Sequence, residues 1–453
     1  MMLESAKLPN IVIVAIDTLR ADHMHCYGYT KTTAPEIDAL ASESIVFDTA
    51  IAAAIPTMPS FTTLNTGLHP YRHGIVAHVG QRHLSEDILF LPQLAKQRGY
   101  VTIACDNLVV QGEGRGSWFA RGYDHYSGFL YKPFSNQSSK LTDRAIRFLQ
   151  QYADHPLFLF MHYWDPHTPY GPLPPYDLLH YEPGSGPIDM AAVRRIQPEY
   201  YDAFVGDMKL RYPDDYAYIV AQYDGEISQV DAQVGRLIRA IKEQGNWEHT
   251  IFILMADHGE CFGEGNFYFD HHGLYDAVTR LALMLHLPDN NARRIGALVS
   301  SEDILPTLAE LVNLSMPPYP LTGTSLLPLL NGTEQEVRPY VVSAESTRQA
   351  SLAVRTPEWK VIQPIVEDCE GHPLPDFYGH SRNAAPLLFD LRTDPAEQHD
   401  LSHEQPEKLA EMLNLLQNWR AEMQRITGQP DPIQSHGLSL PYTRFMERVL
   451  NRK

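Results

Sequence analysis

The chain is poor in cysteine and in basic residues. Its four cysteines, among 453 residues, are widely separated and show no paired spacing, so we expect free thiols and no disulfide framework. Lysine and arginine number 36 against 55 aspartates and glutamates, which gives a formal net charge of −19. This balance argues against a general nucleic-acid-binding protein, because such a protein would carry a basic surface.

Long apolar runs are also missing. The longest early run, Ile11–Ile16, is far shorter than the roughly 20 apolar residues that a membrane helix needs. The preceding residues, Met1–Asn10, include Glu4 and Lys7 but lack the apolar segment and cleavage site of a signal peptide. We therefore expect a cytoplasmic protein that makes no membrane contact and keeps its thiols reduced.

What remains is the composition of a globular enzyme, with 44% hydrophobic and 20% charged residues. The length fits one large domain and one small domain. The texture of the sequence changes after Gly332, and we predict a large domain over 1–333, a small domain over 334–427 and a tail over 428–453. The tail is rich in proline and polar residues. It is either a loose end or an arm that packs on a neighbouring subunit of a homo-oligomer.

Short apolar runs alternate with helical patterns through the large domain. The alternation predicts an α/β fold, with a mostly parallel sheet sandwiched by helices. After Gly332, short strands and one closing helix, Glu407–Arg425, predict a small α+β domain with an antiparallel sheet. The expected strands of the large domain are Asn10–Ile16, Tyr100–Ala104, Leu157–His162 and Thr250–Met255, and the expected helices include Ala34–Glu43, Lys140–Tyr152 and Ala217–Gln244.

Acidic and histidine residues follow two of these strands. Asp17 comes directly after Asn10–Ile16, and the pair Asp257-His258 comes just after Thr250–Met255. Ligand sites in parallel sheets form at the carboxyl ends of the strands, and carboxylate and imidazole groups there can bind a divalent cation. Each motif alone is also typical of a turn or helix cap. Their joint occurrence indicates a metal site.

Thr57 lies in the most informative stretch of the chain, Ile-Pro-Thr-Met-Pro-Ser-Phe over 55–61, which is followed by Thr66-Gly67 and His73-Gly74. This resembles the nucleophile segment of sulfatases, in the alkaline phosphatase superfamily, where Cys-x-Pro-Ser-Arg, Thr-Gly-basic and His-Gly occur in order. In that family the cysteine becomes formylglycine, whose hydrate attacks the ester. Thr57 stands in the cysteine position, and oxidation of a secondary alcohol would yield a ketone instead of an aldehyde. We therefore expect an unmodified hydroxyl as nucleophile.

The resemblance covers almost the whole chain in order, and it implies an alkaline-phosphatase-like sheet with a small C-terminal domain. The further matching elements are Asn10–Gly28, Ala34–Ala50, Gly122–Asp124, Asp165–Tyr170, Tyr223–Ile227, Leu274–Asp276 with Arg280, Glu345-Ser346 and Asp394–Glu397. By resemblance, Asp17, Asp257 and His258 would hold a divalent metal, and Thr57 would be both a metal ligand and the covalent nucleophile. The metal would be Mn, Zn or Ca.

Three histidines are implied to act on the substrate. His167, in the Asp-Pro-His-x-Pro-Tyr loop, would contact the oxyanion of the ester. Where sulfatases carry a lysine after the metal pair, this chain has His271 and His272. His272 would protonate the leaving group or contact the ester, with His271 as a further substrate contact. The alternative is that these histidines bind a second metal ion.

Several departures from the family pattern agree with one another. Phe61 replaces the arginine four residues after the nucleophile, Leu68 replaces the basic residue after Thr-Gly, and Thr18 replaces a second aspartate. In place of a Gly-Lys-Trp-His element the chain has Asp106 and Asn107. Asn107 would either donate a hydrogen bond to the ester or form a strand-end turn. Because the basic residues and the cysteine are absent together, we expect a reaction different from that of the sulfatases.

The predicted function is metal-dependent hydrolysis of phosphate esters. A bound cation lowers the pKa of a hydroxyl that it coordinates, which would activate Thr57. Few basic residues suit a small ester with one negative charge, so phosphodiesters or phosphonate monoesters are favoured. Three alternatives stay open, namely a sulfate ester hydrolase that lacks formylglycine, a phosphotransferase and a non-catalytic binding protein.

Overall fold

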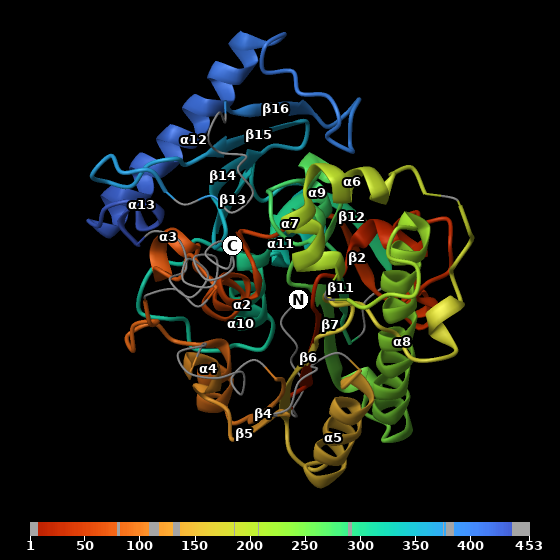
Figure 1. The fold of residues 1–453 in the computed structure, drawn as a ribbon. Helices are drawn as coiled ribbons and strands as arrows, with labels where there is room; N and C mark the ends of the chain where they lie inside the picture. Colours follow the sequence, from red (N-terminus) through yellow and green to blue (C-terminus); the bar gives the residue numbers. More distant parts are fainter. Residues whose placement is uncertain are drawn as a thin grey trace.

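The computed structural model shows a large α/β body and a smaller α+β part, which is blue at the top of Figure 1. Within the described residues, no helix is long and apolar enough to cross a membrane, and the four cysteines are free, as expected. The structure describes residues 8–78, 82–107, 117–129, 136–184, 186–206, 208–288, 292–374, 376 and 385–436.

In the described residues, nine strands form the large sheet, in the order β10-β2-β11-β7-β1-β6-β4-β5, with β12 beside β2. β1 pairs in parallel with both β6 and β7, and only β10 and β11 run against their neighbours. The mostly parallel sheet is therefore confirmed. The strands are β1 Asn10–Ile16, β2 Ile45–Ile51, β4 Val101–Cys105, β5 His125–Ser127, β6 Leu157–Tyr163, β7 Thr250–Ala256, β10 Arg280–Leu281, β11 Leu283–His286 and β12 Arg293–Ser300.

Helices cover both faces of this sheet (Figure 1). The long helix α8 packs against α5 and α1 on one face, and α2, α4 and α10 lie on the other. The apolar side chains of β1 and β7 are buried because both faces are covered, which is why these strands read as continuous apolar runs. The helices are α1 Pro35–Ser42, α2 Thr57–Thr66, α4 Leu91–Gln97, α5 Ser138–Gln151, α8 Tyr216–Glu243 and α10 Ile304–Leu311.

The small sheet has five strands in the described residues, in the order β16-β15-β14-β13-β3. Strands β13 to β16 pair antiparallel, as predicted, and α12, Pro406–Thr427, packs on them. The fifth strand, β3, comes from the large domain's part of the chain and pairs in parallel with β13. The bounds are β3 Ala54–Ile55, β13 Val341–Ser346, β14 Ala350–Arg355, β15 Trp359–Pro364 and β16 Leu387–Asp390.

The first part of the tail packs on its own chain. A short helix, α13 (Pro432–His436), follows α12, and the side chain of Ile433 is fully buried. Asp431 accepts hydrogen bonds from Tyr71 Oη at 2.6 Å and from Arg420 Nη2 at 2.7 Å. Residues 428–436 therefore do not form a loose end. Residues 437–453 lie outside the described residues, and contact of the tail with a neighbouring subunit stays a prediction.

A buried ion network ties the small sheet to the large domain. Lys360 Nζ, on β15, lies 2.8 Å from Asp276 Oδ1 and 2.8 Å from Glu397 Oε1. Asp276 begins helix α9, Asp276–Thr279, which in turn supports Gly259 through a hydrogen bond from Gly259 N to Val278 O at 2.7 Å. A side chain at 259 would clash, because its Cβ would lie 2.0 Å from Ala277 O. The small domain thus supports the loop after His258.

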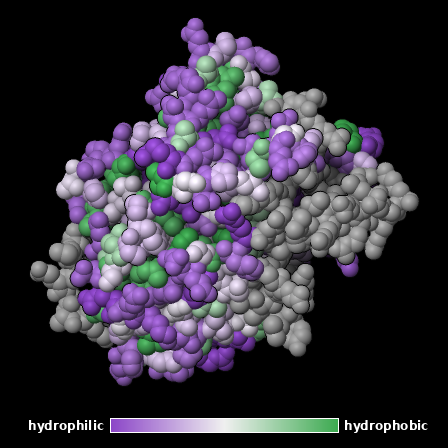
Figure 2. All heavy atoms as spheres, turned by 90° about the vertical axis from the view of Figure 1, so that its left-hand side faces the viewer, coloured by the Kyte–Doolittle hydropathy of each residue, from purple (hydrophilic) through white to green (hydrophobic). Residues whose placement is uncertain are grey.

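The face shown in Figure 2 is mostly hydrophilic. Where described residues form this face, apolar side chains occur singly or in small groups between polar ones. Such scattered apolar residues are normal on a water-facing surface and mark no binding site by themselves.

Candidate active site

The carboxyl ends of β1 and β7 bring the predicted metal residues together. The two strands pair in register, with Ile16 opposite Ala256, so Asp17 and Asp257 leave the sheet side by side. Helix α2 begins at Thr57 and is joined to the end of β7 by a hydrogen bond from Ser60 Oγ to Asp257 O at 2.8 Å.

Asp17, Asp257 and His258 have the geometry of a cation site. One ligand atom from each lies within 4.8 Å of the others, and all three residues are fully buried. His258 Nε2 is 3.7 Å from Asp17 Oδ1 and 3.3 Å from Asp257 Oδ2. Neither of these two oxygens has a hydrogen-bond partner among the described residues. Buried carboxylate oxygens without partners are costly unless a cation binds them, so the residues fit a divalent metal.

The ionisation of these groups agrees with a cation site. Burial raises the pKa of Asp17, and the neighbouring Asp257 raises it further. Burial also raises the pKa of Asp257, to about 6, and lowers that of His258 to about 4. His258 is therefore neutral at pH 7, and its short contacts with the two aspartates are not ion pairs. A neutral imidazole nitrogen is the form that binds a metal.

Thr57 lies beside this cation site. Its Oγ1 is 3.3 Å from His258 Nε2, and its side chain is almost fully buried. Because Thr57 is the first residue of α2, the positive end of the helix dipole is close to its hydroxyl. A helix N-terminus stabilises negative charge on an alkoxide or on a bound anion. The candidate nucleophile and the metal residues thus form one group, as the sequence predicted.

His162, at the end of β6, was not recognised from sequence as part of the site. Its Nε2 lies 3.1 Å from Asp17 Oδ2 and its Nδ1 lies 2.7 Å from Asp106 Oδ1. Burial alone would lower the pKa of His162, but Asp106 and Asp17 raise it to about 10. The imidazolium of His162 therefore fixes the orientation of the Asp17 carboxylate through Oδ2. The sequence signal for His162 was that a polar residue ends the apolar run of β6, which pairs with β1.

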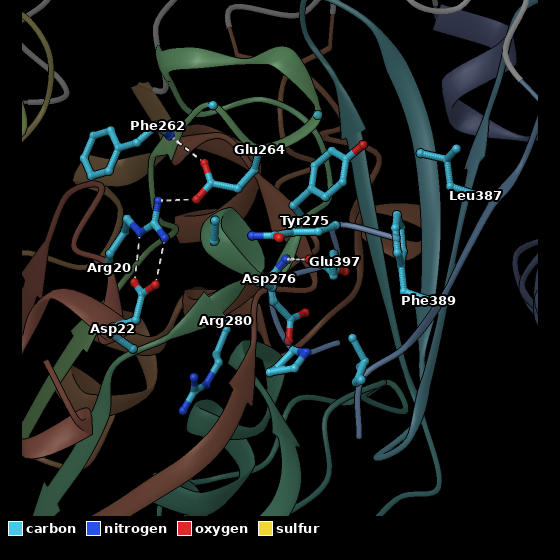
Figure 3. A pocket seen from close by; sticks show the side chains of 18 of the residues that line it. Arg20, Asp22, Phe262, Glu264, Tyr275, Asp276, Arg280, Leu387, Phe389 and Glu397 are labelled. Atoms are coloured by element: carbon cyan, nitrogen blue, oxygen red, sulfur yellow. Dashed lines mark hydrogen bonds and ion pairs between the residues drawn. The ribbon is translucent and has the colours of Figure 1, made fainter. Parts of the chain in front are cut away.

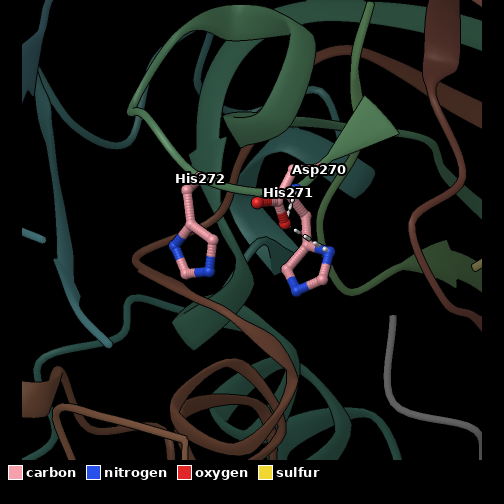
Figure 4. Close-up of side chains that lie close together, drawn as sticks. All are labelled: Asp270, His271 and His272. Atoms are coloured by element: carbon pink, nitrogen blue, oxygen red, sulfur yellow. Dashed lines mark hydrogen bonds and ion pairs between the residues drawn. The ribbon is translucent and has the colours of Figure 1, made fainter. Parts of the chain in front are cut away.

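His167, His271 and His272 gather next to His258. The ring of His271 stacks on that of His258, with 4.9 Å between the ring centroids. The ring centroids of His272 and His167 lie 5.1 and 4.8 Å from that of His271. Figure 4 shows the rings of His271 and His272 side by side, both pointing away from the backbone, with Asp270 beside His271. Burial lowers the pKa of all three histidines, so they are neutral at pH 7.

The small domain contributes to this group, which the sequence did not reveal. Glu345 Oε2, at the end of β13, lies 3.5 Å from His272 Nδ1 and accepts a hydrogen bond from Gly273 N at 3.0 Å. Arg348, in the turn after β13, donates a hydrogen bond to the buried carboxylate of Asp270. The Glu345-Ser346 element of the family resemblance was the only signal for this turn.

Two of the departures from the family pattern are explained by packing. Phe61 is buried and contacts the rings of Phe160 at 5.5 Å and His162 at 4.8 Å, edge to face. Leu68 is buried as well. The positions of the two basic residues of the sulfatase pattern are therefore apolar here.

Asn107 lies near the site, behind Asp106. Its Oδ1 accepts a hydrogen bond from Phe129 N at 2.6 Å, which suits a turn at the end of β4. Among the described residues no hydrogen bond joins Asn107 to Thr57 or to the metal residues. The contact of Asn107 with the ester stays a prediction.

A cavity of about 960 Å³ opens between the two domains, but it is separate from this group. None of the candidate catalytic residues lines it. Figure 3 shows Arg20 held between Asp22 and Glu264, at 2.7 and 2.8 Å, opposite Phe389. Arg20 is thus paired with two carboxylates, which leaves one negative charge in this group.

Metal addition should stabilise the protein strongly. After chelation, Mn, Zn or Ca at a hundred times its dissociation constant should raise the free energy of unfolding by about 2.7 kcal/mol. The stabilisation should decrease as the pH falls through about 6, because burial raises the pKa of Asp257 to that value and the proton then competes with the metal. Thermal unfolding of wild type, Asp257→Asn and the surface control Asp143→Asn measures this. An equal response of all three proteins would contradict the assigned ligands.

Comparison with known proteins agrees with this geometry. Residues 9–314 match the model of the sulfatase family. The chain is 26% identical over 439 residues to the uncharacterized sulfatase YidJ of Escherichia coli (strain K12), covering 87% of this chain and 83% of that protein. It is also 26% identical over 484 residues to the multifunctional alkaline phosphatase superfamily protein PehA of Trinickia caryophylli, covering 87% and 91%. Several other similar proteins are named sulfatases.

The fold is shared with solved structures. The phosphonate monoester hydrolase of Agrobacterium radiobacter superimposes with a TM-score of 0.74 at 21% identity, over 92% of this chain and 96% of that one. The family match spans both the first strand and the loop after the metal pair, so that Asp17, Thr57, Asp257 and His258 all lie within it. The chain belongs to the sulfatase family of ester hydrolases.

Proposed function

We propose that this protein is a metal-dependent hydrolase of phosphate esters that carry one negative charge, with Thr57 as the covalent nucleophile. Phosphodiesters and phosphonate monoesters are the favoured substrates. The observation that carries the proposal is the hydroxyl of Thr57, 3.3 Å from His258 Nε2, in a position where formylglycine cannot form. A divalent cation held by Asp17, Asp257, His258 and Thr57 would lower the pKa of that hydroxyl and withdraw charge from the ester.

The charges around Thr57 support a singly charged substrate. A divalent cation would offset Asp17 and Asp257, and the imidazolium of His162 is paired with Asp106. Among the described residues of the group, Arg348 is the one permanent cation, and it is paired with Asp270. The site is thus close to neutral when loaded. A dianionic ester would face more repulsion than a monoanion, because no unpaired basic residue of the group is available to offset a second charge.

The residues of the chain divide the reaction between them. Thr57 Oγ1 loses its proton to solvent and attacks phosphorus, and the bond from phosphorus to the ester oxygen breaks, so that the alcohol leaves and takes up a proton from water. The N-terminus of α2 stabilises the charge on the attacking oxygen and on the phosphoryl group. His167, His271 and His272 are neutral at pH 7, which favours hydrogen bonds to ester oxygens over protonation of the leaving alcohol. Water must then attack phosphorus to release Thr57, because Thr57 lacks the second hydroxyl of a formylglycine hydrate.

A second candidate function is sulfate ester hydrolysis with the same nucleophile. It is favoured by the names of the similar proteins, several of which are sulfatases. The covalent sulfate ester of Thr57 would have to be cleared by attack of water at sulfur, since no carbon–oxygen cleavage can eject it. We judge attack at phosphorus to be the easier reaction.

A panel of four esters separates these functions. The compounds are bis-(p-nitrophenyl) phosphate, p-nitrophenyl phenylphosphonate, p-nitrophenyl phosphate and p-nitrophenyl sulfate, each assayed with Mn, Zn, Ca or Mg. We expect kcat/KM for the first two to exceed that for the sulfate by at least about tenfold, or about 1.4 kcal/mol of transition-state stabilisation. Preference for the sulfate would overturn the proposal. Product transfer to added glycerol would indicate a phosphotransferase, and no turnover of any ester would indicate a binding protein.

A further inference from the structure

We propose that Glu345, on β13 of the small domain, is a positioning residue whose neutral carboxyl group donates a hydrogen bond to Nδ1 of His272. This bond leaves the ring proton of His272 on Nε2, where it can be donated to an ester oxygen. The inference deepens the proposed function, on which it rests for the role of His272. It makes the small domain responsible for the protonated form in which this histidine meets the substrate.

The carboxyl group of Glu345 is held in one place. Glu345 is fully buried and lies opposite Ser351 in the antiparallel pair of β13 and β14. Its Oε2 accepts a hydrogen bond from Gly273 N at 3.0 Å, and its Oε1 accepts one from Gln349 Nε2. Gly273 directly follows His272 in the loop between β9, Tyr268–Asp270, and α9. The contact therefore fixes the carboxyl group relative to the backbone of His272.

Glu345 is neutral at pH 7. Among the described residues, the ion-pair distance to Glu345 comes from His272 alone, and no lysine or arginine pairs with it. An unpaired carboxylate in the interior is costly, and burial raises the pKa of Glu345 to about 8. The other charged or titratable groups around it are Tyr275, Asp376 and the pair of Arg348 with Asp270. The charge of Asp376 acts in the same direction as burial.

The contact between two neutral groups determines which ring nitrogen carries the proton. His272 Nδ1 lies 3.5 Å from Glu345 Oε2, and such contacts commonly shorten when substrate binds. A neutral carboxyl group has one O–H donor, and a neutral imidazole has one donor nitrogen and one acceptor nitrogen. The acid O–H is the stronger donor and the imidazole nitrogen the stronger acceptor. The O–H of Glu345 therefore donates to Nδ1, and the ring proton of His272 lies on Nε2.

The position of this proton affects the site because His272 belongs to the histidine group beside the metal residues. Its ring lies 5.1 Å from that of His271, which stacks on His258. Once Glu345 ionises, its carboxylate accepts the Nδ1 proton and Nε2 becomes an acceptor, which an anionic ester oxygen repels. Substrate binding should therefore weaken as the pH rises through about 8, where Glu345 loses its proton.

The test compares wild type with Glu345→Gln, which keeps an N–H donor but cannot ionise, and with Glu345→Leu, which has no donor. Glu226→Gln is the matched control, because Glu226 is also fully buried and also accepts a hydrogen bond from a glycine, Gly171 N at 2.8 Å. Each metal-saturated protein is measured for its thermal unfolding midpoint and for kcat and KM with p-nitrophenyl phenylphosphonate below and above pH 8. Nitrogen NMR of histidine-labelled protein reports the tautomer of His272, whose signals are assigned by their loss in His272→Gln.

We expect the ring proton of His272 on Nε2 at pH 7 in wild type and in Glu345→Gln. Glu345→Leu should raise KM about 10- to 100-fold at pH 7, the range for one lost hydrogen bond to a charged group, with kcat changed less. Glu345→Gln should restore most of this loss and should not show the rise in KM above pH 8 that wild type and Glu226→Gln show.

A ring proton on Nδ1 at pH 7, or a Glu345→Gln variant as impaired as Glu345→Leu, would overturn the inference. So would a rise in KM above pH 8 that Glu345→Gln keeps. The tautomer and the pH profile of Glu345→Gln do not depend on whether the leucine variant folds. If wild type prefers the sulfate ester, the proposed function has failed, but the tautomer and the same KM comparison with p-nitrophenyl sulfate still test Glu345.

Discussion

Replacement of Thr57 by alanine should lower kcat/KM for a phosphodiester or phosphonate ester by roughly 10⁴-fold or more, as removal of a covalent nucleophile does. In the proposed mechanism the Thr57 hydroxyl is the group that attacks phosphorus. Thr57 Oγ1 lies 3.3 Å from His258 Nε2, at the start of α2 and beside the cation site. Alanine keeps the helix but leaves no oxygen at that point. Steady-state kinetics of metal-saturated enzyme measure the effect.

Thr57→Ser is the control for this prediction. It retains a hydroxyl on the same Cβ, so we expect activity within about tenfold of wild type, or about 1.4 kcal/mol. Metal content of each variant must be measured, because Thr57 is also a proposed ligand. An alanine variant that binds metal and keeps more than a tenth of wild-type activity would exclude Thr57 as the nucleophile.

Replacement of His162 by leucine should have the second largest effect. His162 is the buried partner of both Asp17 and Asp106, at 3.1 and 2.7 Å. Leucine would leave these carboxylates without their shared cation, and loss of one partner from a buried ion pair costs about 3–5 kcal/mol of folding free energy. Loss of a group that orients a metal ligand lowers metal affinity about 10- to 100-fold. Metal titration and urea unfolding measure the two effects.

A matched control is available in the large sheet. His286 is also buried at a strand end, where it stacks on Trp247 at 4.1 Å, but it contacts none of the metal residues. His286→Leu should lower stability without changing metal affinity. If His162→Leu binds metal as tightly as His286→Leu does, His162 does not orient Asp17.

The sequence was sufficient for the residues that follow buried strands. The apolar runs of β1 and β7 marked where Asp17 and Asp257-His258 leave the sheet, and parallel pairing brings such ends together. Thr57 could be assigned because its motif is local. The large sheet could be predicted for the same reason, since covered strands read as continuous apolar runs.

The remaining parts of the site depend on pairing between segments far apart in the chain. β3 has only two residues, and nothing in Ala54-Ile55 indicates that it joins a sheet formed by residues beyond 340. Without that pairing, Glu345 could not be placed beside the segment that leads to Thr57. His162 was identified as the end of a strand, but its role follows from the order β1-β6-β4, which puts it between Asp17 and Asp106. Strand order is a tertiary property that local patterns do not specify.

The central claim is that an unmodified Thr57 hydroxyl forms a covalent ester with phosphorus. Mass spectrometry of the proteolytic peptide that contains Thr57, from enzyme at rest and from enzyme quenched in acid during turnover of p-nitrophenyl phenylphosphonate, tests it most directly. We expect an unmodified threonine at rest and a phosphonyl group on Thr57 in a fraction of the quenched enzyme. An adduct on another residue, or a burst of p-nitrophenol with no adduct on Thr57, would contradict it.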